Sequence, residues 1–257
     1  MTVVPTPRSR RFSARVARDR GSPQTSRGAT LWDRAAGHWR LRFLGRGADW
    51  APGRELGELQ PPADLAWLEQ RHTIEIAAAR AGSCGVADAI RLEGGGIVAL
   101  VVTADCVPVA VMRGRHALLV HAGWRGIAGE LPRRAAERLN ADEEAAGELV
   151  AWIGPAIGPC CYEVGDDVAA AVAAPSGEAC VVRDAGRRPR LDLRAAVIAQ
   201  LGSAGVTQID VLDHCTRCRP EWLWSYRREG AAAGRNLTLL WRDETHAASA
   251  APVRSTG

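Results

Sequence analysis

Residues 97–127 have the sequence IVALVVTADCVPVAVMRGRHALLVHAGWRGI, in which apolar runs rich in Val lead first to Cys106 and then to His121. Such runs predict buried strands, because β-branched side chains pack well on a pleated, covered surface. A buried strand holds the residue at its end rigidly, so a thiolate and an imidazole on neighbouring strands can meet with little loss of entropy. We therefore expect the chemistry of this protein at Cys106 and His121.

The pattern on both sides of this stretch predicts strands and helices that are interleaved without βαβ regularity, which favours an α+β fold with mixed sheets. Asp192 is placed to cap a helix, and Pro132 indicates that the helix after Gly126 either begins near Leu131 or is kinked there. The predicted strands cover residues 39–44 (an edge strand), 65–68, 74–78, 86–90, 149–153, 209–212, 222–226 and 237–241, the last two as a pair, and the predicted helices cover 127–139, 166–174 and the residues after Asp192.

Composition excludes several classes of protein. All 33 basic residues are arginine, yet the net charge is only +4, so we predict no nucleic-acid partner. The longest uncharged apolar run, residues 97–104, is far shorter than the roughly 20 residues that span a bilayer, which argues against a membrane protein. Seven cysteines without a secretory segment indicate a reducing, cytoplasmic environment. We expect residues 1–30 to be a disordered Arg-rich tail, 31–242 a single catalytic domain, and 243–257 a flexible tail.

His72, beside a predicted strand end, completes a possible metal-binding set with Cys106 and His121. A catalytic zinc ion takes three protein ligands of these types and leaves a fourth position open. The residues alone leave two further interpretations open, a cysteine nucleophile with His121 as its base and a buried cysteine that only packs. Asp105 points away from Cys106 on an extended strand, so it is a candidate acid or base, a partner of a ligand histidine, or a turn residue.

Two further features are less specific. Cys215 and Cys218 form a C-x-x-C motif, but zinc binding would require a second such pair, and Cys160 and Cys161 are adjacent, so we interpret the motif as structural or incidental. Arg125 and Arg228 lie in turns where a guanidinium and backbone N–H groups can hold an anion, although most arginines are solvated surface residues.

Several blocks of the chain together resemble the YfiH-like family, which was long labelled polyphenol oxidase or laccase. The resemblance runs from about residue 65 to 242 and rests on Thr103–Val109, His121–Gly126, Ile153–Gly165, Asp192–Arg194, Cys215–Thr216 and Ser225–Arg235.

The resemblance implies a four-layer α/β/β/α sandwich and a zinc ion held by His72, Cys106 and His121. It implies a purine nucleoside phosphorylase, acting on adenosine, inosine or methylthioadenosine, with adenosine deaminase side activity. Its partners would be the nucleoside and phosphate, with Arg125 and Arg228 as contacts, in a monomer or homodimer. The chain departs from the family in having Arg71 and Thr73 around His72, where the family has Val and Gly, and residues 1–64 match poorly.

We expect zinc and Arg125 to orient phosphate, and Asp105 or a water molecule to protonate the departing purine. A copper-dependent polyphenol oxidase is the main competing hypothesis, although a multicopper site would need about ten histidines and this chain has six, with no H-x-H pair. Two further hypotheses are a cysteine hydrolase that uses Cys106 and His121, and an arginine-rich binding protein without catalysis.

Overall fold

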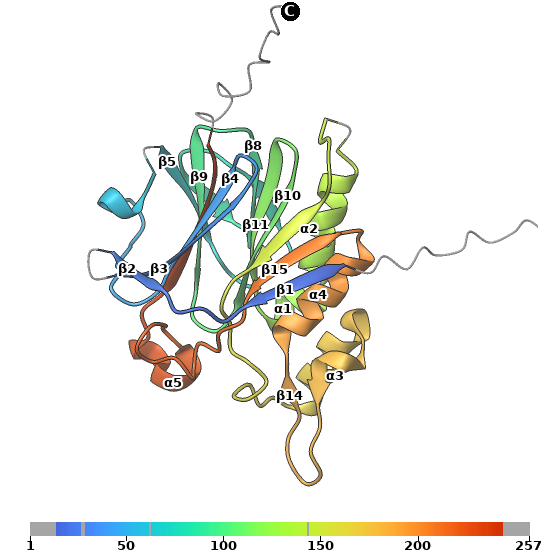
Figure 1. Cartoon of the computed structure of the whole chain (residues 1–257). Helices are drawn as coiled ribbons and strands as arrows, with labels where there is room; N and C mark the ends of the chain where they lie inside the picture. The colour runs from blue at the N-terminus through green and yellow to red at the C-terminus, as the bar shows by residue number, and fades with distance from the viewer. Residues whose placement is uncertain (1–13, 27–28, 62, 143, 244–257) are drawn as a thin grey trace, which may run out of the picture.

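The computed structural model describes residues 14–26, 29–61, 63–142 and 144–243, and it contains two large mixed sheets packed face to face (Figure 1). In sheet I the strand order is β1 (Arg15–Asp19), β15 (Gln208–Leu212), β12 (Val150–Ile153), β10 (Val107–Arg113), β11 (His116–Ala122), β8 (Ala89–Glu93) and β6 (Ile76–Ala78). In sheet II it is β2 (Gln24–Ser26), β3 (Ala29–Ala36), β4 (Trp39–Leu44), β16 (Asn236–Arg242), β9 (Ile97–Thr103), β5 (Asp64–Glu69) and β7 (Gly82–Val86).

Four helices pack on the outer face of sheet I, and the fifth lies apart from them near the end of sheet II (Figure 1). The helices are α1 (Trp124–Ala128), α2 (Leu131–Asn140), α3 (Asp166–Ser176), α4 (Leu193–Ser203) and α5 (Tyr226–Glu229), and a small hairpin is formed by β13 (Val181–Val182) and β14 (Arg190–Leu191). Short 3-10 helices cover Gly57–Leu59, Glu178–Cys180 and Gly230–Ala232.

Strand β10 is buried on both faces, which explains its unbroken apolar sequence. Val109 and Val111 pack against the helices, whereas Ala110 and Met112 pack into the core between the two sheets. Successive strand residues point to opposite faces, so a strand with two covered faces needs apolar residues at every position.

The outer face of sheet II is covered by residues 45–61 and 63 instead of α-helices. Leu56 packs there against Leu44, Leu100 and Leu239, and the segment carries only the 3-10 helix Gly57–Leu59. The α+β class with mixed sheets and a single domain is therefore confirmed, and the fourth layer is a loop with one short helical turn.

The chain crosses from one sheet to the other at Cys106. Strand β9 belongs to sheet II, whereas β10 and β11 are paired in sheet I, with Pro108 opposite His121. The expectation that neighbouring strands deliver Cys106 and His121 is therefore wrong, because residues 104–106 form the connection between the sheets.

Other sequence expectations are confirmed in detail. Asp192 caps α4 by accepting a hydrogen bond from the backbone N–H of Ala195 at 3.0 Å. The helix after Gly126 is divided into α1 and α2 at Glu130, which has a positive φ of 63°, and α2 begins at Leu131 with Pro132 in its first turn.

Two strand predictions are wrong. Residues 39–44 are not an edge strand, because β4 lies between β3 and β16. The strand that pairs with one side of β4, β3, comes from a segment with weak sequence signals. Residues 222–226 are not a strand, because the Ser225 hydroxyl accepts a hydrogen bond from Arg228 N and so begins α5. Strand β16 pairs with β4 and β9 instead.

The ordered structure also begins earlier than residue 31. Strand β1 runs parallel to β15, and Arg18 and Arg20 form ion pairs with Asp213. Residues 15–26 are therefore part of the sheets and not a tail, while residues 1–13 and 244–257 lie outside the described residues. Within the described part of the chain, no helix is long and apolar enough to cross a membrane.

A chain that starts at residue 31 should be less stable than one that starts at residue 14. The shorter chain lacks β1, with its backbone hydrogen bonds to β15, and also β2 and the first two residues of β3. Each backbone hydrogen bond contributes roughly 1 kcal/mol net, so we expect a loss of at least about 2 kcal/mol. Urea unfolding of the two truncated chains measures the difference. Equal unfolding midpoints would contradict the role assigned to β1.

Candidate metal centre

The structure brings His72, Cys106 and His121 together, as the sequence predicted. Their ligating atoms all lie within 4.8 Å of one another, and Cys106 Sγ lies 3.7 Å from His72 Nε2. The two imidazole rings are in edge-to-face contact with centroids 4.9 Å apart. His121 is buried, Cys106 is half-buried and His72 is exposed, so the set opens toward solvent on the His72 side.

Asp88, which the sequence analysis did not single out, fixes the orientation of His121. Its Oδ1 lies 2.7 Å from His121 Nδ1, and its backbone carbonyl accepts a hydrogen bond from His121 N at 2.8 Å. Because Nδ1 is occupied, Nε2 is the nitrogen available to a metal. The only sequence signal for this role is an acid in the otherwise apolar segment 86–90.

The same carboxylate shapes the loop that carries His72. Asp88 Oδ2 accepts hydrogen bonds from the backbone N–H and hydroxyl of Thr73 and from Arg71 N. Upstream, the side-chain amide of Gln70 makes two hydrogen bonds with the backbone of Val102, at 2.7 and 2.9 Å. Held on both sides, His72 adopts a positive φ of 59°, which non-glycine residues rarely do without such support.

Gly123 leaves the space in which the ligands meet. A Cβ at this position would lie 2.5 Å from His72 Cδ2 and 3.1 Å from Cys106 Sγ. Any side chain here would therefore push the imidazole and the thiolate apart.

The three groups shift each other's pKa values strongly. Burial raises the pKa of Cys106, but hydrogen bonds and charge from His121 and His72 bring it down to about 6. Burial lowers the pKa of His121, but its bonds to Asp88 and Cys106 raise it to about 9. Burial opposes ionisation of Asp88, yet the bonds from His121 and Thr73 hold its pKa at about 2. Near neutral pH the site without metal is thus a thiolate and an imidazolium oriented by a carboxylate.

Asp105 lines the cavity, and its carboxylate is held by hydrogen bonds from two other segments of the chain. Its Oδ1 accepts a hydrogen bond from the Thr216 hydroxyl at 2.5 Å, and its Oδ2 accepts one from Arg227 N at 2.6 Å. Its φ is +96°, and its carbonyl accepts a bond from Ile157 N. With both oxygens engaged in holding loops together, Asp105 stabilises the strained turn before Cys106, and it does not bond to a ligand histidine.

A cavity of about 480 Å³ opens onto the three ligands, within the range usual for small-molecule sites. Besides the ligands it is lined by Gln70, Val102, Thr103, Ala104, Asp105, Trp124, Tyr162, Tyr226, Arg227 and Arg235. Burial and the charge of Cys106 raise the pKa of Tyr162 to about 12, so its phenol stays protonated and can donate a hydrogen bond. The hydroxyl of Thr103 is buried and has no hydrogen-bond partner among the described residues.

The two arginines predicted to bind phosphate, Arg125 and Arg228, lie in different surroundings from each other. Arg228 does not line the cavity, and its guanidinium donates to the carbonyls of Thr216, Arg217 and Leu223 and to Glu229, so it is a structural brace. Arg125 is exposed, with its Cζ 4.4 Å from the centre of the Trp124 ring, and Trp124 lines the cavity. Arg227 and Arg235 line the cavity themselves.

The donor set fits a zinc ion with one open position. Imidazoles and thiolates are ligand types of known catalytic zinc sites, which have three protein ligands, and the cavity leaves room for the fourth ligand. Two histidines and a cysteine also bind blue copper, usually with a weak axial methionine. The one methionine in the described residues, Met112, packs in the core between the sheets. The described residues contain no group of histidines that could form a trinuclear copper site.

The chain is similar to one family model and to several known proteins. The family model described as "Multi-copper polyphenol oxidoreductase laccase" matches residues 54–243. A purine nucleoside phosphorylase of Xylella fastidiosa is 36% identical over 195 residues, which cover 70% of this chain and 73% of the relative. The adenosine deaminase RL5, from an unknown prokaryotic organism, is 34% identical over 154 residues, covering 57% of this chain and 59% of its own. The crystal structure of YlmD from Geobacillus stearothermophilus superimposes with a TM-score of 0.69 and 26% identity, over 84% of this chain and 92% of YlmD.

Replacing Gly123 by Ala should empty the metal centre, because the new methyl group would occupy the position needed by His72. We expect zinc bound at this centre to fall at least about tenfold, the range seen when the surroundings of a metal ligand are disturbed. Gly126→Ala is the matched control, since its Cβ would meet no atom closer than 3.7 Å. The measurement is calorimetric binding of added zinc to the folded proteins. If both variants bound zinc as well as the wild type does, the role assigned to Gly123 would be contradicted.

Proposed function

The chain belongs to the family described as multi-copper polyphenol oxidoreductase laccase, and we propose that it is a zinc-dependent purine nucleoside phosphorylase that also deaminates adenosine. The observation that carries this proposal is the set of two histidines and one cysteine at the base of a cavity lined by arginines and aromatic rings. The names of the relatives support it, because they include both purine nucleoside phosphorylases and an adenosine deaminase. Inosine, adenosine and methylthioadenosine are the proposed nucleosides.

The metal would be held by Cys106 Sγ, His121 Nε2 and the imidazole of His72. Zinc in this position supplies a Lewis acid that polarises an oxygen of phosphate or of water. Cys106 contributes one negative charge, which leaves the centre with a net charge of about +1 and therefore able to attract an anion. Asp88 occupies Nδ1 of His121, so that Nε2 would be the nitrogen that holds the metal.

Phosphate would be bound on the arginine side of the cavity. Arg227 and Arg235 line it, and Arg125 adds positive charge next to Trp124. Guanidinium groups suit phosphate because their planar N–H donors match its oxygens. Fixing phosphate against a bound nucleoside supplies much of the acceleration for a displacement at the anomeric carbon.

The nucleoside would be bound by aromatic and hydroxyl groups. Trp124 and Tyr226 line the cavity, and a purine can stack on an aromatic ring. The unpaired hydroxyl of Thr103 and the protonated phenol of Tyr162 are available to hydrogen-bond the sugar or the base. We assign to Tyr162 the hydrogen bond to the departing purine that the sequence analysis gave to Asp105.

Substitution of Cys106 by Ala should abolish phosphorolysis and deamination together, since both reactions depend on the same metal. We expect each rate to fall by at least about 100-fold, because loss of a Lewis acid removes several kcal/mol of transition-state stabilisation. The measurement is base release from inosine, with and without phosphate, and inosine formation from adenosine. Cys84→Ala is the control, because Cys84 is not among the residues that line the cavity and its thiol hydrogen-bonds to the carbonyls of Arg80 and Gly82. Loss of only one activity would disprove a shared site.

A cysteine hydrolase is the second candidate, favoured by the arrangement of Cys106, His121 and Asp88 as nucleophile, base and orienting acid. The two functions differ in the state of the thiolate. In the zinc enzyme the metal protects Cys106, whereas in a hydrolase the thiolate is free in the active protein.

Alkylation of Cys106 by iodoacetamide separates them. We expect the zinc-loaded protein to resist alkylation and the chelated protein to react with a midpoint near pH 6, because the thiol is protonated below its pKa of about 6 and is a reactive thiolate above it. Peptide mass spectrometry measures modification at each cysteine, with Cys84 as the internal reference. Fast alkylation of the active, metal-loaded protein would support the hydrolase, and a midpoint near the ordinary cysteine pKa of about 8.5 would contradict the ion pair.

A further inference from the structure

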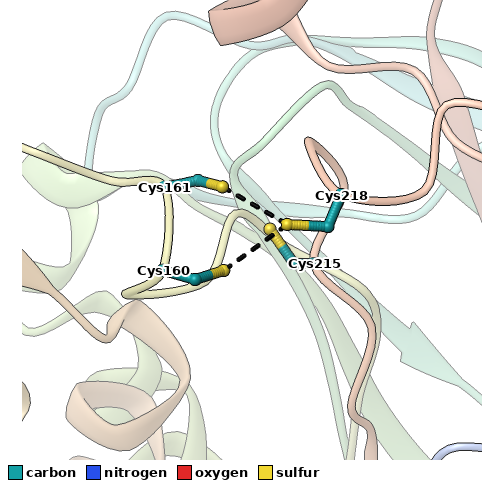
Figure 2. A group of neighbouring side chains, drawn as sticks. All are labelled: Cys160, Cys161, Cys215 and Cys218. Atoms are coloured by element: carbon teal, nitrogen blue, oxygen red, sulfur yellow. Dashed lines mark hydrogen bonds between the residues drawn. The ribbon is translucent and has the colours of Figure 1, made fainter.

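A second group of possible metal ligands lies outside the cavity, at the meeting point of two loops. Cys160 and Cys161 come from the turn after β12, and Cys215 and Cys218 come from the loop after β15. Figure 2 shows the four side chains pointing toward one another from the two loops. Their sulfur atoms all lie within 4.8 Å of one another.

The spacing of the sulfur atoms matches a tetrahedral site. In a zinc site with four cysteines the Zn–S distance is about 2.3 Å, which places the sulfur atoms roughly 3.8 Å apart. Cys161 Sγ and Cys160 Sγ lie 3.4 and 3.7 Å from Cys218 Sγ. Adjacent cysteines would point to opposite sides of a strand, but Cys160 and Cys161 lie in a turn and can therefore face the same centre.

The surroundings favour ionised sulfur at one of the four positions, Cys215. The backbone N–H of Gly158 donates a hydrogen bond to Cys215 Sγ at 3.2 Å, a contact that stabilises a thiolate. The buried guanidinium of Arg194 lies close to the four cysteines. A Cβ placed on Gly158 would be 3.3 Å from Arg194 Nη2 and also 3.3 Å from Cys160 Sγ. Four thiolates this close repel one another strongly, and a divalent cation at their centre removes that repulsion.

We propose that Cys160, Cys161, Cys215 and Cys218 bind a structural zinc ion. All four positions would be filled by protein, which distinguishes this site from the open centre at Cys106. The exposed thiols of Cys160 and Cys218 give the ion a route in from solvent. Zinc binding by these four cysteines does not depend on whether the protein is a phosphorylase.

The zinc would hold the wall of the cavity in place. Thr216, next to Cys215, bonds to Asp105, and the Asp105 carbonyl accepts a bond from Ile157 N in the loop that leads to Cys160. Tyr162, which lines the cavity, follows Cys161 directly. A metal joining the two loops would therefore brace the segments that hold Asp105 and carry Tyr162, without touching substrate.

The test is the zinc content of the full chain, purified under reducing conditions without chelator. We expect the double variant Cys160→Ser, Cys218→Ser to contain one zinc fewer per chain than the wild type, and Cys84→Ser to contain the same amount as the wild type. Because the difference is the readout, the result does not depend on whether the Cys106 centre is loaded. We also expect the double variant to have a lower thermal midpoint.

A second measurement leaves the four cysteines intact. The His72→Ala variant removes the other centre, and its remaining zinc should show only sulfur neighbours, at about 2.3 Å, in X-ray absorption. Equal zinc content in the wild type and the double variant would overturn the proposal, as would nitrogen neighbours in His72→Ala. A zinc-free wild type whose mass shows a disulfide among these cysteines would overturn it as well.

Discussion

The buried carboxylate of Asp88 is the interaction on which the metal centre depends. One of its oxygens holds His121 at the end of β11, and the other holds the loop of His72 through Thr73. The two histidines are 49 positions apart in the chain, His121 in β11 and His72 in the loop between β5 and β6, so the carboxylate joins two separate parts of the fold. A carboxylate with no exposed surface is stable only when its oxygens are satisfied, and here hydrogen bonds from three residues satisfy them.

The rest of the site follows from the crossing between the two sheets. The chain leaves sheet II after β9 and enters sheet I at β10, and Cys106 lies in this connection. Such a sharp crossing requires Asp105 to adopt a positive φ, and the hydrogen bonds from Thr216 and Arg227 hold it there. The backbone strain at this crossing therefore falls on Asp105, the residue directly before the ligand Cys106.

The family description and the donor atoms point to different chemistry. A multicopper oxidase needs clusters of histidines, whereas the described residues bring together two histidines with one cysteine, and separately four cysteines. Both groups consist of ligands that zinc prefers. In our interpretation one centre is open and performs chemistry, and the other is closed and fixes the loops that surround it.

The sequence determined the central strands and brought out the three candidate metal ligands, but not their surroundings. The Val-rich runs of β10 and β11 could be recognised because buried strands have a local apolar pattern, and Cys106, His121 and His72 because few residue types bind metals. Only the tertiary structure showed that Asp88 orients the ligands, that Asp105 and Arg228 are braces, and that Cys160 and Cys161 meet Cys215 and Cys218. Strand β1 was missed for the same reason, since its partner lies almost 200 positions away. Contacts between residues far apart in the chain leave no periodic pattern in a single sequence, so the fold alone decides which polar groups share a site.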